Sequence, residues 1–120
     1  MDEGVPGPHG RRRRRAGDVV GSAAMYPNQP GPGAHVASAS FMVAPGRAGK
    51  GVGRALGTHV LDRARADGYR GMQFNAVVET NTRAVGLWRS LGFGIVGTVP
   101  GAFQHPEQGD VGLHIMYQRL

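Results

Sequence analysis

A glycine-rich stretch at residues 43–56 narrows the folds open to this chain more than any other segment does. An apolar run ends at Pro45, and glycines then follow at alternate positions as Gly49, Gly51 and Gly53, before an amphipathic segment begins. Glycine takes φ > 0 at little cost and lets a ligand or another backbone approach closely. The pattern therefore predicts a tight connection from a strand into a helix.

The start of that helix is predicted to attract an anion. The first amides of a helix lack partners within the helix, and the helix dipole favours negative charge at this end. Arg47, Lys50 and Arg54 add positive charge to the same turn. Together these residues indicate a cradle for a diphosphate between a strand and a helix.

Other interpretations of such a turn remain open or fit less well. Glycines that serve packing alone remain an alternative, because glycine-rich turns between strands and helices are common. A nucleotide P-loop would end in Gly-Lys-Ser/Thr, which is missing here. A dinucleotide fold would need a second βαβ half and an acidic ribose ligand, and the chain has neither at the expected place.

The same stretch resembles the acetyl-CoA-binding motif of the GCN5-related N-acetyltransferases (the GNAT family), Gln/Arg-x-x-Gly-x-Gly/Ala after a strand ending in Val-x-Pro. The two motif glycines fall on Gly51 and Gly53. Ala48 occupies the Gln/Arg position, and the basic residue lies one place earlier, at Arg47. This departure concerns one side-chain contact to the diphosphate, whereas the backbone amides would remain.

A second block, residues 81–93, resembles another signature of the family, Asn-x-x-Ala-x-x-x-Tyr-x-x-x-Gly-Phe. Asn81, Ala84, Gly92 and Phe93 match, and Trp88 stands in the tyrosine position. The two blocks occur in the family's order, joined by a predicted helix and strand. The resemblance covers residues 18–120.

Hydrophobic periodicity predicts an α/β fold with a mixed sheet flanked by helices. Strands are expected at 18–26, 35–43, 72–78, 93–99 and 111–117, and helices at 52–66 and 81–91. Loops are expected at 27–33 and 100–110. The resemblance implies a GNAT-like domain at 18–120 that lacks the family's first strand and first two helices, either through natural truncation or through a wrongly assigned start.

Residues 1–17 are predicted to form a disordered tail, because they are rich in Gly, Pro and Arg and offer no face to bury. Arg11–Arg15 is an unbroken basic run in a chain of net charge +6. One interpretation is an arm that binds nucleic acid. A solvated tail is favoured instead, because no aromatic residue lies between the arginines to stack on bases.

The composition restricts other classes of site. The chain has no cysteine, which excludes disulfides, a thiolate nucleophile and cysteine-based zinc sites, and is compatible with the cytoplasm. No apolar run approaches the roughly 18 residues of a membrane span, and no secretory signal is recognisable. His59 and the run His105-Pro106-Glu107 lack metal-ligand spacing, so no metal is expected.

The resemblance implies a binding site for acetyl-CoA as cosubstrate, between two strands that separate near Phe41 and near Asn75–Val77. A backbone amide near Val43 would stabilise the oxyanion of the reaction. Asn81 would bind the cofactor arm, cap the following helix, or do both. The residues implied to hold the cofactor are Phe41, Met42, Val43, Arg47, Ala48, Gly49, Lys50, Gly51, Val52, Gly53, Arg54, Asn75, Asn81 and Trp88.

The catalytic candidates are Glu79, Trp88 and Tyr117. Glu79 precedes the second helix and is a candidate base, alongside His35 and His114. Trp88 stands where the family places the acid for the leaving thiolate, but an indole N–H donates a hydrogen bond without delivering a proton. Tyr117 or water could then supply that proton, and Trp88 would be a wall of the thioester pocket.

The sequence leaves three candidate functions. The first is an N-acetyltransferase that transfers acetyl to a primary amine of a small molecule or peptide. The second is a weakly active or inactive acyl-CoA-binding remnant, which could assemble as a homodimer. The third, disfavoured, is a nucleic-acid-binding module that works through the arginine run.

Overall fold

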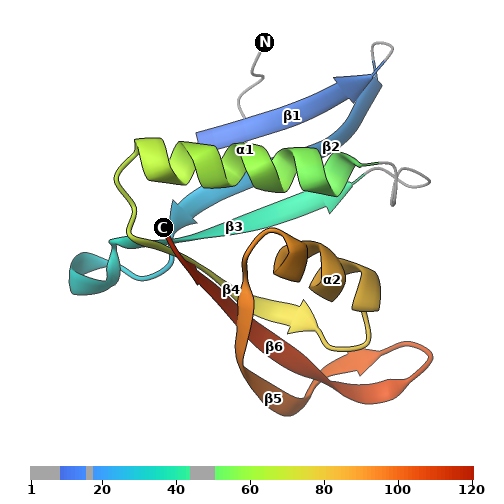
Figure 1. The fold of residues 1–120 in the computed structure, drawn as a ribbon. Helices are drawn as coiled ribbons and strands as arrows, with labels where there is room; N and C mark the ends of the chain where they lie inside the picture. Colours follow the sequence, from blue (N-terminus) through green and yellow to red (C-terminus); the bar gives the residue numbers. More distant parts are fainter. Residues whose placement is uncertain (1–8, 16–17, 44–50) are drawn as a thin grey trace.

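The computed structural model describes residues 9–15, 18–43 and 51–120, in which one mixed sheet carries both helices on the same face (Figure 1). In chain order the elements are β1 (His9–Arg15), β2 (Asp18–Pro27), the short 3-10 helix η1 (Gly31–Gly33), β3 (Val36–Val43), α1 (Val52–Ala66), β4 (Gly71–Val78), α2 (Thr82–Ser90), β5 (Gly94–His105) and β6 (Gly109–Arg119). The predicted α/β class with a mixed sheet is confirmed.

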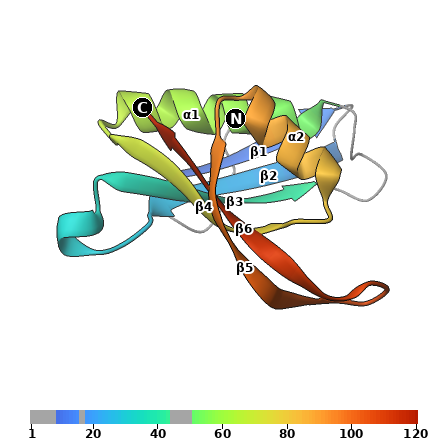
Figure 2. The same cartoon turned by 60° about the horizontal axis from the view of Figure 1, so that its bottom comes forward.

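The sheet has six strands in the order β1-β2-β3-β4-β6-β5. Only the central pair, β3 and β4, is parallel, and the other neighbours pair antiparallel. Parallel neighbours need a crossover connection, which α1 supplies. Figure 2 shows α1 and α2 above the sheet and the β5–β6 hairpin extending away from them.

The core lies between the sheet and the two helices. Val52, Leu56 and Val60 form the predicted apolar stripe of α1, and all three are buried against β2 and β3. Gly57 lets the helices approach, since a Cβ there would come within 2.9 Å of Trp88 Cζ3. This close approach places the first turn of α1 beside α2.

Residues 9–15 correct one expectation. They form strand β1, which pairs antiparallel with β2, so the predicted disorder is wrong for this part of the tail. Backbone pairing does not depend on an apolar side-chain pattern, and charged residues are common on edge strands, where they discourage further pairing. The rest of the predicted tail, residues 1–8 and 16–17, lies outside the described residues.

The expected loop at residues 100–110 is also wrong, because strand pairing continues on both sides of a short turn. β5 extends to His105 and β6 begins at Gly109. Pro100 lies where the β5–β6 register shifts between Val99 and Phe103, so the ladder does not need its missing N–H. A proline in an edge strand can therefore lead to a wrong prediction of a loop.

Tyr117, one of the predicted catalytic residues, packs over Gly71 at the start of β4. A Cβ added at Gly71 would lie 2.5 Å from the Tyr117 hydroxyl oxygen and 2.7 Å from Cε1. We therefore expect Gly71→Ala to lower the free energy of unfolding by about 1–3 kcal/mol, through overpacking. Urea denaturation followed by circular dichroism measures the effect.

Gly86→Ala is the matched control for this substitution. Gly86 lies in α2, and a Cβ there would meet nothing within 4 Å. Alanine should raise stability by about 0.5–1 kcal/mol at such a helical position. Equal stability of Gly71→Ala and the parent chain would mean that the Tyr117 ring moves aside without cost.

Candidate active site

The parallel strands β3 and β4 separate after a short paired segment. They are in register only at Val36↔Gly71 and Ala37↔Met72. Beyond these pairs β3 stays with β2, and β4 stays with β6, so the two strands diverge toward their C-terminal ends (Figure 1). The predicted separation near Phe41 and near Asn75–Val77 is confirmed.

A cavity of about 450 Å³ occupies this separation. Ser38 and Ser40 alternate along β3 with Ala39 and Phe41, so the lining includes residues from both faces of the sheet. The cavity is therefore a passage between the strands. Its lining residues are Tyr26, Ser38, Ala39, Ser40, Phe41, Phe74, Asn75, Ala76, Val77, Val78, Asn81, Ala84 and Trp88.

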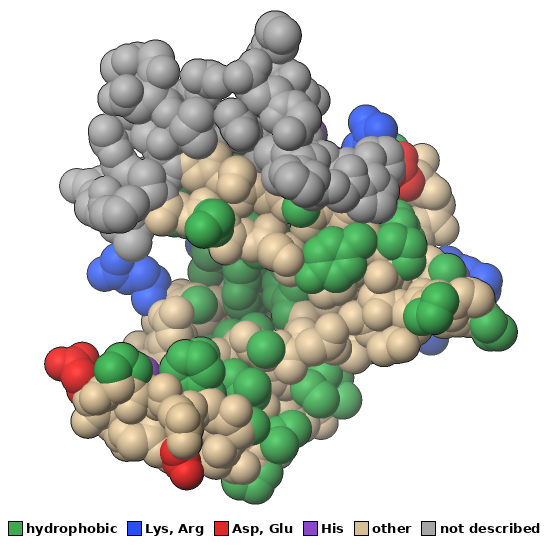
Figure 3. All heavy atoms as spheres, turned by 180° about the vertical axis from the view of Figure 1, so that it is seen from behind, with side chains coloured by type: hydrophobic (Ala, Val, Ile, Leu, Met, Phe, Trp, Pro, Cys, Tyr) green, Lys and Arg blue, Asp and Glu red, His purple; other side chains and the backbone are tan. Residues whose placement is uncertain are grey.

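A second cavity, of about 650 Å³, lies on the helix side. It is lined by Phe41, Val43, Gly51, Gly53, Arg54, Asn81, Arg83, Ala84, Gly86, Leu87 and Trp88. Phe41, Asn81, Ala84 and Trp88 line both cavities, so the two lie next to each other. In the view from behind, Figure 3 shows a hollow with hydrophobic side chains in its floor.

The N-terminus of α1 lies at the edge of the second cavity. Gly51 is the N-cap with φ 81°, and no side chain caps the helix there. The first intrahelical bond joins the Ala55 amide to the Gly51 carbonyl, 3.0 Å away, so the preceding amides have no partner in the helix. Gly51 and Gly53 line the cavity, and this end of the helix can therefore accept an anion.

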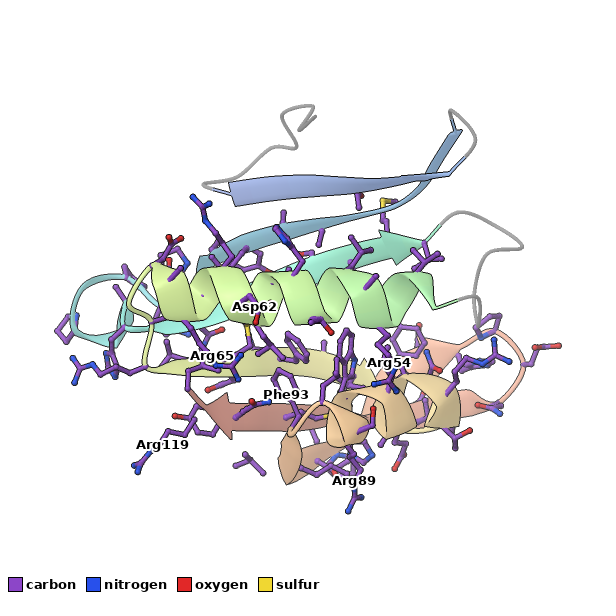
Figure 4. The ribbon with its side chains drawn as sticks, turned by 45° about the horizontal axis from the view of Figure 1, so that its top comes forward. Arg54, Asp62, Arg65, Arg89, Phe93 and Arg119 are labelled. Carbon is purple, nitrogen blue, oxygen red and sulfur yellow. The ribbon has the colours of Figure 1, made fainter. Side chains whose placement is uncertain are left out.

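Two arginines bring positive charge to the same cavity. Arg54 on α1 donates to Ser90 Oγ at 2.8 Å, and Figure 4 shows it lying between α1 and α2. Arg83 lines the cavity from the first turn of α2 and is exposed. Both guanidinium groups suit a phosphate-bearing ligand.

Asn81 caps α2, as one of its two predicted roles requires. Its Oδ1 accepts a hydrogen bond from the Ala84 amide at 3.1 Å. The side chain also lines both cavities, where its NH₂ group is a donor. The cap is confirmed, and the contact to the cofactor stays a prediction.

Trp88 lies at the centre of an aromatic cluster and is only 8% exposed. Its ring centroid lies 4.9 Å from that of Phe41, 4.8 Å from that of Phe74 and 6.1 Å from that of Phe93. Figure 4 shows Phe93 to one side of α2, below α1. Trp88 thus combines packing with a wall shared by the two cavities.

Several other predicted cofactor residues lie apart from the cavities. Met42 is 74% exposed and lines neither of them, and the Val52 side chain is buried on the core-facing side of α1. Arg47, Ala48, Gly49 and Lys50 lie outside the described residues. The part of the predicted cradle that can be placed is therefore residues 51–54.

The structure does not bring the predicted bases to the two cavities. Glu79 is bound to Gly112 on β6: its amide donates to the Gly112 carbonyl at 3.0 Å, and its carboxylate accepts from the Gly112 amide. His114 Nδ1 lies 2.6 Å from Thr98 Oγ1 on β5. Neither these residues nor His35 and Tyr117 line either cavity.

Sequence reasoning predicted Asn75 but missed its polar neighbours along the passage. The Tyr26 hydroxyl is hydrogen bonded to Ser40 Oγ at 3.0 Å, and Asn75 Nδ2 donates to Asn28 Oδ1 at 2.6 Å. These pairs depend on strand neighbours that are distant in sequence.

Arg83 was missed as well, although it gave a signal. A cation in the first turn of a helix opposes the helix dipole, which suggests a role other than helix stability.

The described part of the chain offers little support for other kinds of site. It holds no group of three or more His, Asp or Glu side chains that could bind a metal ion. Neither of its α-helices is long and apolar enough to cross a membrane.

Comparison with known proteins identifies the family. The model of the Acetyltransferase (GNAT) family matches residues 6–93, so the chain belongs to this family. The resemblance predicted from the two sequence blocks is thereby confirmed. The match begins before β1, which agrees with the inclusion of that strand in the sheet.

Similar proteins include the N-acetyltransferase aca1 of Schizosaccharomyces pombe, 33% identical over 84 residues that cover 70% of this chain and 40% of that protein. A GCN5-related N-acetyltransferase from Kribbella flavida has a similar structure, with a TM-score of 0.85, 65% identity and coverage of 87% and 62% of the two chains. The structure of yncA from Salmonella typhimurium, solved with its cofactor acetyl-CoA, matches with a TM-score of 0.79 at 27% identity, over 89% and 61% of the chains. The chain thus spans about two fifths of aca1 and less than two thirds of these solved chains.

Proposed function

We propose that the protein binds acetyl-CoA across the two neighbouring cavities and transfers the acetyl group to a primary amine of a small molecule or peptide. The observation that carries this proposal is the passage between β3 and β4, which adjoins the cavity at the N-terminus of α1. Among the described residues, β3 has no strand partner on this side beyond Ala37 and no side chain caps α1, so both can offer polar backbone groups to a ligand.

The larger cavity fits the charged part of the cofactor. The amides of residues 51–54 would receive the diphosphate, and Arg54 and Arg83 would balance its charge. The passage fits the amide-bearing arm, because β3 and β4 expose backbone groups there that can pair with another chain of amides. Asn75 and Asn81 add side-chain amides to this route.

Acetyl-CoA supplies a thioester whose carbonyl carbon an amine can attack. The chain would position the two reactants, and backbone amides of β3 near Val43 would stabilise negative charge on the carbonyl oxygen. Phe41 and Trp88, which line both cavities, would exclude water from the reacting groups. Because Glu79 is bound to Gly112 and Tyr117 packs over Gly71, away from both cavities, the proposal assigns them no proton transfer.

Calorimetric titration of the folded chain with acetyl-CoA tests the proposal. A substitution of Arg83 tests in addition whether the cofactor binds in the larger cavity. Arg83→Gln removes a charge that lines the larger cavity, so we expect the Kd for acetyl-CoA to rise about threefold to fivefold, as for an exposed ion pair. The increase should shrink at high salt because screening weakens the charge interaction.

Arg89→Gln is the control, since Arg89 is also an exposed arginine of α2 but lines neither cavity. Its Kd should equal that of the parent chain. Absence of binding heat with the folded parent chain would overturn the proposed function. Equal changes in Kd for Arg83→Gln and Arg89→Gln would show that Arg83 is not part of the binding site.

A second candidate is binding of acyl-CoA without efficient transfer. It is favoured by one observation: among the described residues that line the passage, none is an aspartate, glutamate or histidine. Thiol release measured with a panel of amines separates the two candidates. Tight binding without thiol release would support the second, and release that depends on the amine would support the first.

A further inference from the structure

A third cavity, of about 350 Å³, adjoins the passage at the end of the β5–β6 hairpin. One wall is the turn between β4 and α2, and the other is the hairpin end, with Phe103, His105 and Gln108. Val78 and Asn81 line both this cavity and the passage. A molecule whose amine lies in the passage can therefore place its other end here.

His105 is held in one orientation at this hairpin end. The amides of Glu107 and Gln108 both donate to its Nδ1, each at 3.1 Å. Its ring lies edge-on to Phe103, with centroids 6.4 Å apart. Because Nδ1 accepts two hydrogen bonds, the neutral ring carries its proton on Nε2, which leaves Nε2–H as the donor for a ligand.

The rest of the lining defines the ligand. Phe103 provides an apolar surface, and Thr80 and Gln108 provide neutral polar groups. Among the described residues around this cavity none carries a full charge when His105 is neutral. A neutral donor beside a phenyl ring suits an uncharged oxygen on an apolar carbon skeleton, and the described lining offers a carboxylate no cation as a partner.

We propose that this cavity is the part of the acceptor site that selects amines bearing an uncharged carbonyl oxygen, as in α-amino amides and peptide N-termini. His105 Nε2–H donates to that oxygen, and Phe103 contacts the side chain of the acceptor. The inference rests on the proposed acetyl transfer for its biological meaning. Binding of the acceptor in this cavity can be measured without turnover.

Paired amines and paired variants test the specificity. Leucinamide carries the oxygen, 3-methylbutylamine lacks it, and leucine replaces it with a carboxylate. His105→Asn keeps an acceptor near the position of Nδ1 and loses the distal donor, whereas His105→Gln can place an amide N–H near the position of Nε2. The ratio of kcat/KM for leucinamide to that for 3-methylbutylamine should fall about fivefold in His105→Asn, the worth of one neutral hydrogen bond.

The ratio should be largely restored in His105→Gln, and leucine should be the poorer acceptor of the two leucine compounds. Gln104→Ala, at an exposed position of β5 outside the cavity, is the control and should leave the ratio unchanged. An unchanged ratio in His105→Asn would overturn the proposal, and so would a preference for leucine over leucinamide.

Nuclear magnetic resonance of histidine-labelled protein tests the same contact without catalysis. We expect an Nε2–H tautomer for His105, and a shift of its Nε2 resonance on titration with leucinamide but not with 3-methylbutylamine. A proton on Nδ1, or no shift at saturating amide, would overturn the inference. Calorimetry with acetyl-CoA reports separately on the proposed function, so the two failures can be told apart.

Discussion

Trp88→Ala is expected to lower the free energy of unfolding by about 3–5 kcal/mol, as for a large buried aromatic residue. Trp88 is buried and contacts the rings of Phe41, Phe74 and Phe93, which come from β3, β4 and the short connection between α2 and β5. Removal of the indole leaves a void where these elements meet. Chemical denaturation with fluorescence-independent detection, such as circular dichroism, measures the loss.

Trp88→Phe is the matched variant, because it keeps an aromatic ring in the cluster. The free energy of unfolding should fall clearly less in Trp88→Phe than in Trp88→Ala. Trp88→Phe should also still bind acetyl-CoA, since a phenyl ring can form the wall shared by the two cavities. A destabilisation below about 1 kcal/mol for Trp88→Ala would contradict the central packing role, because buried aromatic residues cost several times more.

Gly53→Asp is expected to raise the Kd for acetyl-CoA by about 5- to 100-fold without unfolding the protein. A Cβ at Gly53 would lie 3.1 Å from Leu87 Cδ2, and both residues line the larger cavity, so the new carboxylate would enter it. A like charge about 5 Å from a phosphate costs about 1–3 kcal/mol near a protein surface. An acidic residue in the first helical turn is itself favourable for the helix.

Gly53→Asn separates charge from volume. Asparagine has nearly the same size as aspartate and no charge, so its Kd should lie much closer to that of the parent chain. Calorimetry at low and high salt measures both variants, and the gap between them should narrow as salt screens the repulsion. Equal effects of Asp and Asn would show that volume alone blocks the site and would argue against a phosphate at the N-terminus of α1.

Short-range features were predictable from the residues that form them. Gly51 at the left-handed N-cap of α1, Asn81 as the cap of α2, and Gly92 with φ 104° after α2 all lie where the sequence places them. Each depends on the conformational freedom or hydrogen bonding of a residue and its near neighbours. The two family blocks are built around these same positions, which is why the family could be recognised from them.

Contacts between strands could not be predicted in the same way. The arginine run joins the sheet as β1 through backbone pairing, and Glu79 is bound to Gly112 rather than facing a cavity. The pairing of Tyr26 with Ser40 requires the β2–β3 register, in which Tyr26 lies opposite Ser38. A register is chosen by the packing of whole strands, and no local pattern in the chain specifies it.

The amino-acid sequence alone determined the mixed α/β class and the positions of the helix termini, because these follow from local conformational preferences and the hydrophobic pattern. The tertiary structure decided which side chains meet. It separated β3 from β4 and placed two neighbouring cavities on either side of Phe41 and Trp88. It also brought Arg83 to the larger of these cavities and His105 to the third cavity at the end of the β5–β6 hairpin. Side chains converge on a site only once strand pairing and helix packing have set their directions, and that information is distributed over the whole fold.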